Sequence, residues 1–192
     1  MDTVKYTELK SKRILITGGL GFIGSNIGRK CVESGAEVTL LDGCLEPYGW
    51  NRFNIAGIEE KVTFIKGDVR DKDLVKRLLR GKHIVFHMAA QVGREISMEN
   101  PALDAEINCL GTLNCLEAAR YMDEKPKIVF AGSRGQTGEP VTLPVTEDHP
   151  DNPTDIYGIN KLAAEKYLFL YGSVYDIPVT SVSYTHLRAH ET

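Results

Sequence analysis

Short apolar runs alternate with helix-like segments along this chain, and this alternation limits the folds that it can adopt. The first run, residues 14–16, is apolar throughout, as is typical of a strand buried on both faces of a parallel sheet. Further strands are predicted at 38–41, 62–66, 84–87, 128–131 and 179–182, and helices at 22–34, 71–79, 101–121 and 154–171. Strands interleaved with helices predict an α/β fold, a doubly wound parallel sheet with helices on both faces.

The composition is that of a globular domain in water, with 42% hydrophobic and 26% charged residues. The net charge of −3 makes nucleic acid and lipid surfaces poor candidates for partners. No apolar run approaches the roughly 18 residues that span a bilayer, and residues 1–12 lack the apolar stretch of a signal peptide. Because the four cysteines show no CxxC spacing, we expect free thiols in a reducing cytoplasm and no metal site.

A glycine triplet directly follows the first predicted strand. Gly18, Gly21 and Gly24 lie at GxxGxxG spacing in the segment TGGLGFIG. They would allow a tight turn, a close approach of the backbone to a pyrophosphate, and close packing of the next helix. The amides at Phe22 and Ile23, where that helix begins, would then point at the phosphates. This pattern predicts a Rossmann-type dinucleotide site, although a triplet by itself also fits a flexible turn.

Acidic residues end the next two strands. Asp42 ends the second strand, where a carboxylate can accept hydrogen bonds from an adenosine ribose and would repel a 2′-phosphate. NAD is therefore expected rather than NADP. Asp68 and Val69 end the third strand, where Asp68 would contact the adenine amine. The ordinary alternatives are a strand-end acid for Asp42 and a helix-capping acid for Asp68.

Tyr157 and Lys161 lie four residues apart in the helix predicted at 154–171, so they share one helix face. A tyrosine hydroxyl titrates near ~10. A nearby ammonium, with the positive nicotinamide of NAD+, would lower that pKa and allow the tyrosine to act as a base. Lys161 would also hold the nicotinamide ribose. The pair alone is common on helix surfaces, and the dinucleotide site before it gives it weight.

Residues 11–180 resemble the extended short-chain dehydrogenase/reductase family of nucleotide-sugar enzymes. The matching segments, in family order, are TGGLGFIG, Asp42, GDVRD, HMAAQ, INxxGT, Ser133 and YGINK. The resemblance implies that Ala89, Ala90 and Gln91 line the nicotinamide side of the cofactor, and that Asn108 supports the backbone or water network of the site. The ordinary alternative for Asn108 is a helix-face amide, and His87 is expected to be structural rather than catalytic.

The resemblance also implies a catalytic set of Ser133, Tyr157 and Lys161, in which Ser133 hydrogen-bonds the reacting sugar hydroxyl. The sequence departs from the family at two places: Thr137 stands before Gly138 where a tyrosine is usual, and Gly132 replaces a common serine. These departures bear on the shape of the loop. The ordinary alternative for Ser133 is a loop-capping hydroxyl.

In this family, the residues after the serine distinguish the reactions. The 4,6-dehydratases carry an Asp-Glu pair there, and decarboxylases and GDP-mannose dehydratases usually keep a Glu two residues on. This chain has Arg134 and Gly135, neither of which can act as acid or base at useful pH. We therefore expect NAD-dependent epimerisation of a nucleotide-activated sugar through a transient keto-sugar. The alternatives are a dehydratase or decarboxylase of the same family, an enzyme with a non-nucleotide substrate, and a non-catalytic NAD-binding regulator.

We predict that residues 1–181 form the NAD-binding domain. Family members continue into a small C-terminal domain that holds the sugar nucleotide, and this part is expected to be missing. Residues 182–192, VSYTHLRAHET, do not resemble that continuation and are predicted to be an adapter-derived, non-native tail, with a natural short tail as the alternative. The chain would then lack most of the substrate pocket. The resemblance also implies a homodimer formed through helices 101–121 and 154–171.

Overall fold

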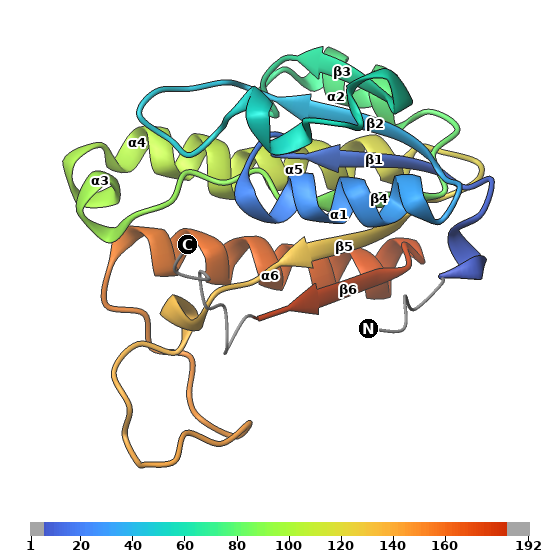
Figure 1. The fold of residues 1–192 in the computed structure, drawn as a ribbon. Helices are drawn as coiled ribbons and strands as arrows, with labels where there is room; N and C mark the ends of the chain where they lie inside the picture. Colours follow the sequence, from blue (N-terminus) through green and yellow to red (C-terminus); the bar gives the residue numbers. More distant parts are fainter. Residues whose placement is uncertain (1–5, 184–192) are drawn as a thin grey trace.

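The computed structural model describes residues 6–183, which form one six-stranded parallel sheet in the order β3-β2-β1-β4-β5-β6 (Figure 1). The strands are β1 (Arg13–Thr17), β2 (Glu37–Asp42), β3 (Val62–Lys66), β4 (Ile84–His87), β5 (Lys127–Ala131) and β6 (Val179–Val182). Each predicted strand is present, with ends shifted by one residue at most. The order reverses between β1 and β4, and open α/β sheets bind ligands at such a switch point, beyond the carboxyl ends of the strands.

The helices are α1 (Phe22–Glu33), α2 (Lys72–Leu79), α3 (Arg94–Glu99), α4 (Pro101–Asp104), α5 (Gly111–Arg120) and α6 (Ile156–Tyr175). A π-helical segment, Ala105–Leu110, joins α4 to α5, so the helix predicted at 101–121 contains a wider turn. The short helix α3 was not predicted. Helix α6 starts two residues later than predicted, because the side chain of Asp155 caps it by accepting a hydrogen bond from the Gly158 amide at 2.7 Å.

The two faces of the sheet bury separate apolar cores, as the alternation of side chains along a strand requires. Leu15 of β1 packs in a core with residues of α2, α5 and α6. Its neighbours Ile14 and Ile16 point to the other face and pack in a core with Cys31 of α1. Figure 1 shows α1 in front of the sheet and α5 and α6 behind it. The prediction of a doubly wound sheet with helices on both faces is confirmed.

His87, at the end of β4, has the structural role expected of it. The side chain is buried between two threonines, with Nδ1 2.8 Å from Thr17 Oγ1 and Nε2 3.0 Å from Thr112 Oγ1. Burial, with a smaller effect of Lys161, lowers the pKa of His87 to about 3. The imidazole is therefore neutral and ties β1 and β4 to α5.

The end of the described chain belongs to the sheet. The carbonyl of Val182 accepts a hydrogen bond from the Gly132 amide at 2.8 Å, so β6 runs one residue past the domain boundary predicted at 181. The rest of the predicted adapter-derived tail, from residue 184 on, lies outside the described residues. Within residues 6–183, none of the helices is long and apolar enough to cross a membrane.

Candidate active site

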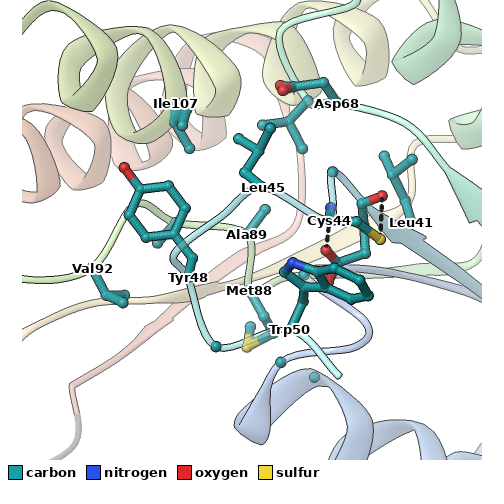
Figure 2. A pocket seen from close by; sticks show the side chains of 18 of the residues that line it. Leu41, Cys44, Leu45, Tyr48, Trp50, Asp68, Met88, Ala89, Val92 and Ile107 are labelled. Carbon is teal, nitrogen blue, oxygen red and sulfur yellow. Dashed lines mark hydrogen bonds between the residues drawn. The ribbon is translucent and has the colours of Figure 1, made fainter. Parts of the chain in front are cut away.

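A pocket opens at the switch point, beyond the carboxyl ends of β1, β2 and β4 (Figure 2). Most of the predicted cofactor residues line it: Gly18, Gly21, Phe22, Ile23, Gly24, Asp42, Asp68, Val69, Ala89 and Ala90. The loop that follows β2 supplies residues 43–45 and 48–50 to the same pocket. Nothing in the sequence pattern indicates which side chains of this loop turn inward.

The glycine triplet builds a cradle that only glycine can form. Gly18 has φ +66°, in the left-handed region that glycine adopts without strain. A Cβ atom on Gly24 would lie 2.2 Å from the carbonyl oxygen of Gly18, so a side chain there would collide with the backbone. Helix α1 begins after Gly21 with no side-chain cap. The N–H groups of its first turn therefore remain free to bind an anion such as a pyrophosphate.

Asp42 joins the glycine cradle to the loop that follows β2. Its carboxylate is 8% exposed, and its Oδ2 accepts a hydrogen bond from the Leu20 amide at 2.9 Å. Its Oδ1 accepts one from the Cys44 amide, also at 2.9 Å. Each carboxylate oxygen keeps a further lone pair, so Asp42 can still accept hydrogen bonds from ribose hydroxyls. The geometry fits the predicted role and adds a structural one that the sequence did not indicate.

Asp68 lines the pocket and is held by Arg70. The guanidinium Nη2 donates to Oδ2 at 2.8 Å, and Nε donates to Oδ1 at 3.1 Å. Burial acts to raise the pKa of Asp68, but the hydrogen bonds from Arg70 outweigh it and hold that pKa below its ordinary value. The alternative role as a helix cap is wrong. Helix α2 is capped by Asp71, whose side chain accepts a hydrogen bond from the Leu74 amide at 3.0 Å.

Gln91 and Asn108 are not among the residues that line the pocket, in contrast to Ala89 and Ala90. The side chain of Asn108 holds the backbone of Gln91 from both sides: Oδ1 accepts from the Gln91 amide and Nδ2 donates to its carbonyl, each at 3.0 Å. Both residues are about 1% exposed. This clamp fits the expectation that Asn108 supports the backbone of the site.

Ser133 and Tyr157 meet where the end of β5 packs against the first turn of α6. This packing depends on Gly158, because a Cβ atom there would lie 2.5 Å from the carbonyl oxygen of Gly135. Ser133 Oγ accepts a hydrogen bond from the Gly135 amide at 3.1 Å, so it caps the short turn that follows. The same hydroxyl acts to lower the pKa of Tyr157, and both side chains border position 135. The loop-capping role is therefore present, and the hydroxyl that fills it lies near Tyr157.

In the chain by itself, burial and not Lys161 has the largest effect on the pKa of Tyr157. Burial raises the pKa of Tyr157 above its ordinary value, Ser133 acts to lower it, and nearby carboxylates act to raise it further. Lys161 is 2% exposed, and its Nζ lies 4.0 Å from the ring centre of Phe130. Burial lowers the pKa of Lys161 to about 7, against an opposing effect of nearby carboxylates. The low-dielectric surroundings thus disfavour both the phenolate of Tyr157 and the ammonium of Lys161.

One of these carboxylates, Asp104, was missed by sequence reasoning. It is fully buried, and its Oδ1 accepts a hydrogen bond from Asn160 Nδ2 at 2.8 Å. Its Oδ2 has no hydrogen-bond partner within residues 6–183. Its charge acts to raise the pKa of both Tyr157 and Lys161. An acid inside a helical pattern is usually solvent-exposed, so nothing in the sequence marked this one.

Position 135 lies directly beside Tyr157. A Cβ atom on Gly135 would be 3.8 Å from Tyr157 Cδ1 and 3.4 Å from Ser133 Oγ. Arg134 is exposed, whereas Gln136 is buried and its Nε2 donates to Glu165 at 2.6 Å. Gln136 therefore fixes the loop. The position next to the tyrosine carries no side chain.

Position 132, where the family commonly has a serine and this chain has Gly132, lies close to other side chains. A Cβ atom there would lie 2.8 Å from Ser183 Oγ and 3.0 Å from Gln136 Oε1. The space that a serine would fill is thus already occupied by two neighbouring side chains.

The parallel sheet, the glycine cradle at its switch point and the Ser-Tyr-Lys set together define a Rossmann-type domain of the extended short-chain dehydrogenase/reductase class. The family model described as GDP-mannose 4,6 dehydratase matches residues 15–190, and the chain belongs to this family.

Similar proteins include both epimerases and dehydratases. UDP-glucose 4-epimerase of Mycolicibacterium smegmatis is 35% identical over 173 residues, which cover 89% of this chain and 55% of that protein. The Thermus thermophilus UDP-glucose 4-epimerase, solved in complex with NAD, is 39% identical with a TM-score of 0.79, covering 90% of this chain and 54% of that one. A Streptomyces venezuelae dTDP-glucose 4,6-dehydratase with NAD bound is 29% identical with a TM-score of 0.81, and the match covers 89% of this chain and 55% of that one. The chain spans about half the length of the curated relatives it matches.

Proposed function

We propose that this chain supplies the NAD site and the acid–base residues of an enzyme that epimerises a nucleotide-activated sugar through a transient keto-sugar. The observation that carries the proposal is that Ser133 and Tyr157 both border position 135, at the same carboxyl edge of the sheet as the glycine cradle. Relatives named UDP-glucose 4-epimerase support it, and one of them was solved in complex with NAD.

The cofactor is NAD rather than NADP. The open end of α1 suits a pyrophosphate, and Asp42 suits a ribose that carries free hydroxyls. A 2′-phosphate would meet the carboxylate of Asp42, and the residues that line the pocket include no lysine or arginine to bind it. Calorimetric titration should give at least about tenfold tighter binding of NAD+ than of NADP+, and Asp42→Asn should reduce the difference. Equal affinities in the unaltered chain would contradict this assignment.

Tyr157 and Ser133 handle the proton of the substrate. When bound, NAD+ supplies a reversible acceptor for the hydride of the sugar carbon. Tyr157 takes the proton from the hydroxyl on that carbon and later returns it, while Ser133 hydrogen-bonds the same sugar hydroxyl and acts to lower the pKa of Tyr157. Because burial raises the pKa of Tyr157, the phenolate needs additional positive charge near its oxygen at neutral pH. Epimerisation requires that the keto-sugar turns over before the carbon is reduced again.

Position 135 favours epimerisation over elimination of water. Elimination needs a further acid and base beside the reacting sugar, and the position next to Tyr157 is Gly135, which has no side chain. Arg134, the residue before it, is exposed, and its side chain offers only hydrogen-bond donors. A dehydratase remains the second candidate, because the matching family model and one similar structure carry dehydratase names.

The test uses the chain alone and the chain joined to the C-terminal half of the Mycolicibacterium smegmatis relative. Each is incubated with NAD+ and UDP-, dTDP-, CDP- or GDP-hexoses, and the products are resolved by NMR. A sugar epimer of unchanged mass, lost in Tyr157→Phe, is the expected result. A product lighter by water or carbon dioxide would assign a dehydratase or decarboxylase. Tight NAD+ binding without turnover would favour a regulator or a non-nucleotide substrate.

We further propose a cytoplasmic homodimer formed through helices 101–121 and 154–171. Both helices carry exposed apolar side chains, among them Leu110 and Tyr121 on the first and Phe169 and Leu170 on the second. The four cysteines are free thiols, which suits a reducing compartment. Sedimentation equilibrium should give a dimer that Leu170→Glu dissociates, and a monomer at high concentration would contradict the assembly.

A further inference from the structure

The indole of Trp50 holds a buried donor that lacks a partner. Trp50 lines the pocket on the loop that follows β2, and its Nε1 is buried with no hydrogen-bond partner within residues 6–183. In Figure 2 this nitrogen lies on the edge of the ring turned toward the middle of the pocket. An indole nitrogen only donates, so the missing partner must be an acceptor atom. A buried donor left unpaired is costly, and such a group therefore indicates an absent acceptor.

The loop that carries Trp50 is fixed to the glycine cradle. The carbonyl of Leu20 accepts hydrogen bonds from the Asn51 amide at 3.1 Å and from Asn54 Nδ2 at 2.8 Å. The guanidinium of Arg29 in α1 donates to the carbonyls of Asn54 and Ala56, at 2.7 and 2.8 Å. The backbone that directly follows Trp50 is thus held by contacts with the cradle and α1.

The same contacts place Trp50 at the adenosine end of the pocket. Leu20 connects three parts of the site, because its amide donates to Asp42 while its carbonyl accepts from Asn51. Asp42 is the residue that would receive the adenosine ribose. Tyr157 and Lys161, which belong to the reacting end, are not among the residues that line this pocket.

We propose that Trp50 Nε1–H donates a hydrogen bond to an oxygen of the adenosine diphosphate half of the dinucleotide. This inference rests on the proposed function, because it needs NAD as the ligand. Phosphate and ribose oxygens are the acceptors that this half of the molecule offers in number. The side chains lining this part of the pocket are otherwise apolar apart from Asp42, Cys44, Asp68 and the hydroxyl of Tyr48, so the indole adds a side-chain donor to the backbone N–H groups of α1.

The experiment exploits the fact that Trp50 is the single tryptophan of the chain. The 15N-labelled chain gives one indole N–H resonance, which is followed by NMR while NAD+, ADP-ribose, AMP or nicotinamide mononucleotide is added. ADP-ribose and NAD+ should shift the indole proton downfield, as a new hydrogen bond requires, and nicotinamide mononucleotide should leave it unchanged. An indole resonance that stays in place while ADP-ribose binds would overturn the inference.

Calorimetry on Trp50→Phe provides the second measurement, because phenylalanine keeps an aromatic ring and removes the donor. Affinity for NAD+ and for ADP-ribose should each fall about tenfold, the effect of one hydrogen bond to a polar ligand. Phe53→Leu, on the same loop at an 80% exposed position, is the control and should bind as the unaltered chain does. Unchanged affinity in Trp50→Phe would overturn the inference alone. An unaltered chain that binds neither NAD+ nor ADP-ribose would instead overturn the proposed function, and the inference with it.

Discussion

Gly24 faces Gly18 so closely that a Cβ atom on Gly24 would lie 2.2 Å from the carbonyl oxygen of Gly18. Because that oxygen belongs to the backbone, a side chain at 24 must displace the whole turn. We expect Gly24→Ala to lower the free energy of unfolding by about 1–3 kcal/mol and to weaken NAD+ binding. Urea denaturation and calorimetry measure the two effects.

Gly28→Ala is the matched control in the same helix. A Cβ atom there would lie 3.4 Å from Leu40 Cδ2, an ordinary contact. Alanine also favours a helix by up to about 1 kcal/mol over glycine, so this variant should be as stable as the unaltered chain or more so. Equal losses of stability in Gly24→Ala and Gly28→Ala would show that the contact with Gly18 is not the cause.

Gly138 closes the base of the loop between β5 and α6. It has φ +69°, and a Cβ atom on it would lie 1.8 Å from the carbonyl oxygen of Asn152. Gly57 has a similar φ of +83° but open space around it. Gly57→Ala should cost only backbone strain, about 1–2 kcal/mol. Gly138→Ala should cost more and make the loop easier to cleave by protease. Equal losses in the free energy of unfolding for Gly57→Ala and Gly138→Ala, measured by urea denaturation, would show that position 138 does not lie close to the carbonyl oxygen of Asn152.

His87 makes stability depend on pH in a predictable direction. Its pKa is about 3 in the folded chain and 6.5 ordinarily, so only the unfolded chain takes up this proton between those values. The stability that depends on neutral His87 is complete above pH 6.5 and is lost as the pH falls toward 3, by up to about 1.4 kcal/mol per pH unit. Urea denaturation at pH 7, 6 and 5 should show that the free energy of unfolding falls less with decreasing pH in His87→Gln than in the unaltered chain. An equal fall in the two chains would mean that His87 is protonated in the folded chain.

Asp104 should control the charge of Lys161. The pKa of Lys161 is about 7, and the Asp104 carboxylate is one of two that act to raise it. Asp104→Asn keeps the shape of the side chain and removes the charge, so the pKa of Lys161 should fall further. NMR titration of 13C-labelled lysine side chains measures it. Glu124→Gln, at an exposed position before β5, is the control and should leave the titration unchanged. An unaltered pKa in Asp104→Asn would show that the two charges do not interact.

Local patterns were enough to predict the architecture of this protein. The apolar runs of β1 to β6 indicated buried strands because their length and period are properties of neighbouring residues. The triplet Gly18, Gly21 and Gly24 indicated the cradle for the same reason, since the turn it forms spans only a few residues. The predicted start of α6 was two residues too early, because a single side chain, Asp155, decides where the helix begins.

The tertiary structure decided what depends on distance and burial. The placement of the loop that carries Trp50 beside the pocket depends on contacts with Leu20, and the burial of Asp104 follows from the packing of α4 against α6. The pKa of Tyr157 is raised in the chain by itself because burial opposes its charged form, and burial is set by residues far away in sequence. The sequence by itself determined the six strands, most of the helices, their order along the chain and the glycine turn, because each depends on neighbours along the chain. Which polar groups lie buried together, and in which charge state, became definite only once the chain was folded.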